Sequence, residues 1–133
     1  MAAEDRPVAF VDSSAIVALV DEDDSAHLAA VDAYRELNSS GYRLFTTDHV
    51  IVETYDLLMD GVGPVVAGTW LRNQRLPIYC TDESDLASAQ AILTARPVES
   101  PISFTNAISL AVMERLGVTD AFAVDPAFLD ALS

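Results

Sequence analysis

The stretch VAFVDSSA at residues 8–15 decides the fold of this chain. Its four leading apolar residues have the length of a strand, which ends abruptly at Asp12, and the serine pair then opens an apolar helix over residues 15–20. A strand without polar alternation is typical of a parallel sheet that is covered on both faces. The stretch therefore predicts the first strand–helix unit of an α/β domain.

The same order of strand and helix recurs along the chain. Further strands are expected at residues 43–47, 77–80 and 121–124. Helices are expected at residues 25–37, 48–61, 64–73, 83–94 and 105–116, with a short last one from Pro126. No repeat, linker or low-complexity segment interrupts this order, so we expect a single domain over residues 1–133.

Three helix starts carry specific expectations. The acidic residues 21–24 precede the helix at 25–37, whose spacing predicts that Leu28, Val31 and Tyr34 face inward. Polar side chains are expected to cap two later helices, Asp48 the helix at 48–61 and the pair Thr105–Asn106 the helix at 105–116.

The composition excludes several classes of protein. With 51% hydrophobic residues and a mean hydropathy of +0.27, the chain is not an intrinsically disordered acidic segment. All seven basic residues are arginine, so mechanisms that need a lysine, such as Schiff-base chemistry, a Walker-type phosphate loop or a receiver-domain switch, are excluded. The single cysteine, Cys80, excludes an intrachain disulfide and a cysteine-rich metal site.

The formal charge of −14 has two interpretations. A sequence-independent nucleic-acid binder normally carries a basic face, and this chain has no basic cluster. Alternatively, an excess of aspartate without lysine resembles proteins of halophiles, in which molar salt shortens the Debye length to about 3 Å and screens self-repulsion. No apolar run reaches the roughly 18 residues of a membrane span, and residues 1–5 do not form a signal peptide. We therefore expect a cytoplasmic protein with no membrane partner, and we hypothesise a halophilic source.

Acidic side chains lie where a parallel sheet binds ligands. Asp12 and Asp125 each follow an apolar strand, and ligands bind beyond the carboxyl ends of such strands. Either residue alone could simply cap a helix, but two together favour a site. Glu53 interrupts an apolar helical run, where a charge is costly unless it is paired, faces a cleft or lies on the solvent side.

Four motifs together resemble a known family. VDSSA (11–15), VET (52–54), SFTNAIS (103–109) and AVDPAF (123–128) are similar to the successive motifs of PIN-domain ribonucleases, most closely of VapC-like toxins from prokaryotic toxin–antitoxin pairs. The resemblance implies a three-layer α/β/α sandwich with a central parallel sheet of four or five short strands. It also implies an endoribonuclease with a divalent-metal site, a cognate antitoxin protein and a homodimer.

The resemblance assigns the site residue by residue. Asp12 matches the first acid of the pattern, Glu53 the second and Asp125 the fourth, whereas the third is Asn106 in this chain. Together they would bind Mg²⁺ or Mn²⁺, hard cations that prefer oxygen ligands. Asn106 offers an amide oxygen but no negative charge, so metal binding should be weaker or limited to one ion. Three explanations stay open: an engineered Asp→Asn change, a natural loss of activity, or a substitute acid such as Asp120.

Polar neighbours of these four residues have two interpretations each. His49 lies one helical turn before Glu53 and could act as a general base or could simply pack. Arg115 could contact phosphate or could offset the dipole at a helix end. Ser13 and Thr105 could position a water or phosphate, or could cap helices.

Two functions follow from these residues and motifs. The first is a metal-dependent endoribonuclease that hydrolyses RNA phosphodiester bonds as a toxin, with Asn106 expected to weaken or disarm it. The alternative is a catalytically degenerate PIN-like module that acts through protein–protein binding.

Overall fold

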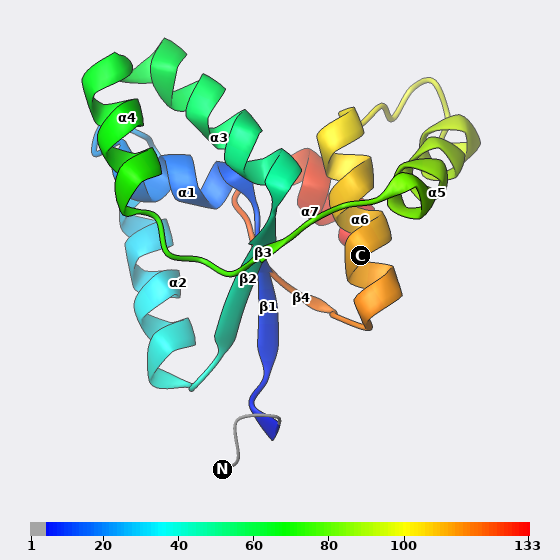
Figure 1. Cartoon of the computed structure of the whole chain (residues 1–133), viewed down its shortest axis with the longest axis horizontal. Helices are drawn as coiled ribbons and strands as arrows, with labels where there is room; N and C mark the ends of the chain where they lie inside the picture. Colours follow the sequence, from blue (N-terminus) through cyan, green and yellow to red (C-terminus); the bar gives the residue numbers. More distant parts are fainter. Residues whose placement is uncertain (1–4) are drawn as a thin grey trace.

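Four parallel strands form the centre of the protein, whose computed structural model describes residues 5–133 (Figure 1). The strands are β1 (Val8–Val11), β2 (Arg43–Thr47), β3 (Ile78–Tyr79) and β4 (Asp120–Phe122), and their order in the sheet is β3-β2-β1-β4. In this register Ala9 of β1 pairs with Leu44 of β2, and Val11 pairs with Phe122 of β4. The central strand β1 is the most buried, as its apolar sequence predicts.

Helices cover both faces of the sheet, so the structure has the three layers expected for a PIN-like fold. The helices are α1 (Ser13–Val20), α2 (His27–Ser39), α3 (Asp48–Gly61), α4 (Pro64–Asn73), α5 (Glu83–Ala95), α6 (Phe104–Leu116) and α7 (Pro126–Leu132). In Figure 1, α1 and α2 lie on one side of the sheet and α5 and α6 on the other. The main core surrounds Phe10, whose ring lies 5.8 Å from that of Phe45 and 6.1 Å from that of Phe128.

The strands at the sheet edges differ from their expected bounds. The ladder of β4 ends when Asp12 N donates to Phe122 O at 2.9 Å, and the next amides of Val124 and Asp125 donate to the Ser14 hydroxyl instead. The expected strand end at residue 124 is therefore wrong. Strand β3 is shorter than the expected 77–80, because the chain turns away when Thr81 N donates to Asp48.

Two expected helix caps are also wrong by a few residues. Thr47, not Asp48, caps α3 by accepting from Val50 N, and Ser103, not Thr105–Asn106, caps α6 by accepting from Asn106 N. Both true caps lie in the extended conformation that a cap requires. The corrections matter because they free the side chains of Asp48 and Asn106 for other contacts.

Helix α2 buries a different face from the one that its spacing predicts. The side chains of Asp21 and Asp24 accept from the backbone two residues ahead and form turns, so the helix begins only at His27. Ala30 is fully buried and Leu37 packs against the core, whereas Leu28 is 76% exposed. Small residues let α2 approach its neighbours closely, and the large apolar ones lie outside.

Arg115 closes the contact between α5 and α6. Its guanidinium donates to Asp85 at 2.9 Å and to Asp82 at 3.2 Å, and Tyr79 donates to the other oxygen of Asp85 at 3.0 Å. The hypothesis of a phosphate contact is therefore not supported, since Arg115 is bound in an ion pair at the far end of α6 from Asn106.

No helix within residues 5–133 combines the length and apolar character that crossing a bilayer requires. The expectation that no signal peptide is present concerns residues 1–5, of which 1–4 lie outside the described part of the chain.

Candidate active site

The four side chains assigned by motif line one hollow of about 500 Å³ at the carboxyl edge of the sheet. Asp12 directly follows β1, and Asp125 follows β4 after two more residues. Glu53 comes from α3 and Asn106 from the first turn of α6. Residues that are far apart in sequence are therefore brought to the same place, as expected for a site at this edge of a parallel sheet.

A hydroxyl group joins the ends of the two central strands. Ser14 Oγ donates to Asp12 Oδ2 at 2.6 Å and accepts from the amides of Val124 at 3.0 Å and Asp125 at 3.2 Å. It thereby fixes the Asp12 carboxylate relative to the segment that carries Asp125. The sequence motifs pointed to Ser13 and not to Ser14, although the serine pair was the available signal.

Glu53 faces the hollow rather than the solvent side of its helix. Its carboxylate accepts a short hydrogen bond from the hydroxyl of Ser13, which is only 4% exposed. Thr54, beside it in sequence, is fully buried, while Asp56 is exposed. The Ser13 contact joins α1 to α3 and settles the alternative that sequence left open for the direction of Glu53.

Asp12 is the most unusual group of the site. It is 1% exposed, and its Oδ1 atom has no hydrogen-bond partner among residues 5–133. Burial raises the pKa of this carboxyl, hydrogen bonds from Ser14 oppose that change, and the charge of Glu53 adds to it. A buried carboxylate oxygen without a partner is costly, and a cation would remove that cost.

Asn106 and Asp125 are joined where the family pattern has two acids. Asn106 Nδ2 donates to Asp125 Oδ2 at 3.3 Å, and Asn106 is only 6% exposed. The amide orientation is assigned from this hydrogen bond. Asp125 Oδ1 also accepts from Ala127 N and caps α7, while Asp12 caps α1, so both aspartates are caps as well as members of the hollow.

The donors of this hollow are those that a hard divalent cation prefers: three carboxylates and an amide oxygen. The unpartnered oxygen of Asp12 fits such an ion. Within residues 5–133, however, no three histidine, cysteine, aspartate or glutamate side chains are already arranged to hold a metal. The substitution of Asn106 for an acid and the bond between Ser13 and Glu53 are consistent with that finding.

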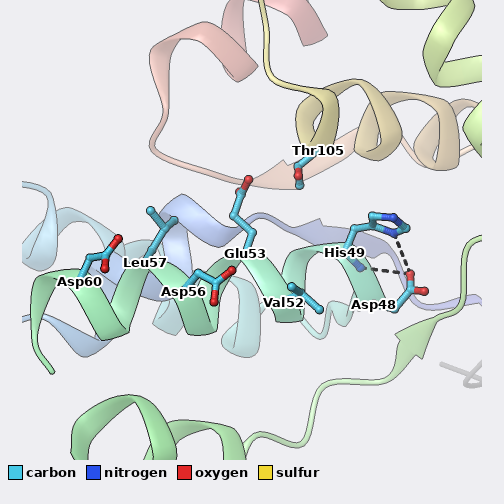
Figure 2. A pocket seen from close by; sticks show the side chains of 8 residues that line it. All are labelled: Asp48, His49, Val52, Glu53, Asp56, Leu57, Asp60 and Thr105. Atoms are coloured by element: carbon cyan, nitrogen blue, oxygen red, sulfur yellow. Dashed lines mark hydrogen bonds and ion pairs between the residues drawn. The ribbon is translucent and has the colours of Figure 1, made fainter. Parts of the chain in front are cut away.

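A second hollow of about 560 Å³ adjoins the first and shares Glu53 and Leu57 with it (Figure 2). At one end, His49 Nδ1 lies 2.8 Å from Thr81 Oγ and 3.3 Å from Asp48 Oδ1, and Thr81 Oγ donates to Asp48 at 3.0 Å. Burial alone would raise the pKa of Asp48, but the bonds from Thr81 and His49 outweigh it and lower that pKa. The sequence pointed to His49 but not to its two partners.

Comparison with known proteins agrees with this arrangement. The sequence profile of the PIN domain matches residues 9–131. The crystal structure of VapC20 from Mycobacterium tuberculosis, described as a sarcin–ricin loop cleaving toxin, superposes with a TM-score of 0.78 and 30% sequence identity. The match covers 93% of this chain and 94% of that one. No curated protein matches the chain significantly. The chain therefore belongs to the PIN-domain family and is a VapC-like PIN ribonuclease.

Proposed function

We propose that this protein is a divalent-metal-dependent endoribonuclease and the toxin of a toxin–antitoxin pair. The observation that carries the proposal is the buried, unpartnered oxygen of Asp12 in one hollow with Glu53, Asn106 and Asp125. The similarity to VapC20, a toxin described as cleaving RNA of the sarcin–ricin loop, supports the substrate class.

The metal would be held by the carboxylates of Asp12, Glu53 and Asp125 and by the amide oxygen of Asn106. When bound, Mg²⁺ or Mn²⁺ supplies charge stabilisation at the scissile phosphate and lowers the pKa of an attacking water. Ser14 keeps the Asp12 carboxylate in position beside Asp125, and Ser13 does the same for Glu53. The cation also supplies positive potential, which a chain with a charge of −14 otherwise lacks near a polyanion.

Asn106 should weaken this activity without abolishing it. Its amide donates to Asp125 and so occupies a carboxylate oxygen that a metal would use. We expect an Asn106→Asp substitution to increase metal affinity and cleavage, because a further negative charge then faces the cation.

The experiment is cleavage of an end-labelled hairpin RNA by the purified protein in molar KCl, with Mg²⁺, Mn²⁺ or EDTA. Cleavage that needs the metal, rises in Asn106→Asp and disappears in Asp12→Ala supports the proposal. If Asn106→Asp binds no Mn²⁺ by calorimetry and leaves the RNA intact, the proposal fails.

A second candidate function is a PIN-like module that binds proteins without cleaving RNA. The hydrogen bond between Asn106 and Asp125 favours it, since the pair is stable without a metal. This function predicts that neither the wild type nor Asn106→Asp cleaves RNA, while both bind the protein encoded next to this gene.

The partners and setting belong to the same proposal. Exposed apolar side chains on α2, α3 and α4, among them Leu28, Val52 and Val65, suit a homodimer and a bound antitoxin. A cytoplasmic location and a halophilic source are consistent with the acidic composition. Sedimentation velocity across a KCl series tests both dimer formation and the need for salt.

A further inference from the structure

The hollow beside the candidate active site has the chemistry of a hydrogen-bond acceptor. Its polar lining consists of Asp48, His49, Glu53, Asp56, Asp60 and Thr105. Four of these six are carboxylates, and no arginine lines either of the two adjoining hollows. A phosphate group is poorly suited to such a wall, because it brings a further negative charge without a cation to meet it. A neutral ligand that donates hydrogen bonds is well suited.

The tautomer of His49 is set by its two partners. Thr81 Oγ directs its single proton to Asp48, so its lone pairs face His49 Nδ1 at 2.8 Å, and the Asp48 carboxylate can only accept. The Nδ1 atom therefore carries the proton in the neutral ring. It follows that Nε2 has a free lone pair and acts as an acceptor.

The position of His49 places this acceptor close to the scissile bond. The side chain is 37% exposed and lies one turn before Glu53 on α3, a residue that lines both hollows. In Figure 2 the imidazole and the Glu53 side chain rise from the same side of α3 toward Thr105 on α6. A nucleotide next to the scissile phosphate would therefore meet His49 first.

We propose that this hollow is a ribose subsite in which His49 Nε2 accepts a hydrogen bond from the 2′-hydroxyl of a nucleotide flanking the scissile phosphate. The inference rests on the proposed ribonuclease function and adds a specificity-determining residue to it. The 2′-hydroxyl is the group that distinguishes RNA from DNA, so His49 contributes to the choice of RNA.

The test combines single 2′-deoxy substitutions in an RNA substrate with substitution of His49. In the wild type, one 2′-deoxy position beside the cleavage site should lower kcat/KM about fivefold, as the loss of one neutral hydrogen bond does. In His49→Ala the same deoxy substitution should have no effect, and His49→Gln, which keeps an acceptor, should restore part of it. His27→Ala is the matched control, because His27 Nδ1 is bound to Ala18 O on α1.

The outcome that overturns the subsite is a deoxy penalty of equal size in the wild type and in His49→Ala. A separate readout does not need cleavage: fluorescence anisotropy with labelled RNA and DNA of one sequence in Ca²⁺. The wild type should prefer RNA, and His49→Ala should lose that preference, since phosphate charge is the same in both probes. If the RNA is cut but the preference is unchanged in His49→Ala, the subsite is wrong while the ribonuclease function stands. If neither probe binds nor is cut, both proposals fail.

Discussion

Asp12 and Asp85 are buried to the same degree, each about 1% exposed, yet their carboxyl groups respond to burial in opposite ways. At Asp85, hydrogen bonds from the Asp82 amide, Arg115 and Tyr79 outweigh the effect of burial and lower the carboxyl pKa. At Asp12, the bonds from Ser14 do not compensate for burial, and the pKa is raised. A buried acid with all its oxygens satisfied indicates a structural role, whereas one with an unpartnered oxygen indicates a ligand.

The largest difference between the two aspartates should appear in activity. Asn at position 12 keeps the helix cap but removes the charge that would face a cation, so Asp12→Asn should lower RNA cleavage at least about a hundredfold. Asp85→Asn should leave the rate per folded molecule unchanged, because Asp85 lies between α5 and α6, away from the hollow. Initial rates on a labelled RNA hairpin measure both, and comparable losses would contradict the separation of roles.

Unfolding should show the reverse ranking. Asp85→Asn weakens the contacts with Arg115 and Tyr79 at a buried position, and we expect a loss of about 2 kcal/mol in the free energy of unfolding. Asp12→Asn should cost less, since it removes a buried charge that is incompletely paired. Urea unfolding in constant KCl measures the two values, and an equal or larger loss in Asp12→Asn would reverse this interpretation.

A smaller effect is expected where Asp12 is held in place. Ser14→Ala removes a hydroxyl that makes three hydrogen bonds and leaves the amides of Val124 and Asp125 without their acceptor, so it should cost about 1.5 kcal/mol. Ser13→Ala, the matched control, removes only the bond to Glu53 and should cost less. Urea midpoints of the two variants decide this; a larger loss in Ser13→Ala would assign the joining role to the wrong serine.

How far the sequence alone could lead differs between the same two regions. Asp12 and Asp125 were predictable, because each ends an apolar strand and parallel strands end at one edge. Asp85 was not, because its partners Arg115 and Tyr79 are recognisable only once α5 packs on α6. The inward face of α2 was misjudged for a similar reason: two aspartate turns moved the helix start, and no periodicity rule contains that shift.

The direction of Glu53 and the tautomer of His49 could not be predicted from sequence either. Helical spacing allows Glu53 either a cleft or solvent, and the decision comes from Ser13 on another helix. The tautomer depends on Thr81, which is brought to His49 by the turn that follows β3. Sequence patterns therefore located the acids of the site, whereas contacts between elements determine how these acids and their neighbours are held.

The smallest expected effect is a difference in pH dependence between Asp12 and Asp85. The folded-state pKa of Asp12 lies above the ordinary 3.8, so its ionised form opposes folding at neutral pH, and this opposition disappears as the pH falls through the raised pKa toward 3.8. The folded-state pKa of Asp85 lies below 3.8, so its contribution is present above 3.8 and is lost as the pH falls through the lowered pKa. The stability of Asp12→Asn relative to wild type should therefore be highest at neutral pH and should decline toward pH 4, whereas the deficit of Asp85→Asn should persist to pH 4 and shrink only below it. Thermal unfolding from pH 3 to 7.5 at fixed KCl measures both trends, and Glu53→Gln, which removes the neighbouring charge, should reduce the pH dependence that Asp12 contributes. A stability difference for Asp12→Asn that does not change with pH would mean that its carboxyl titrates normally, and the contrast between the two aspartates would then rest on geometry alone.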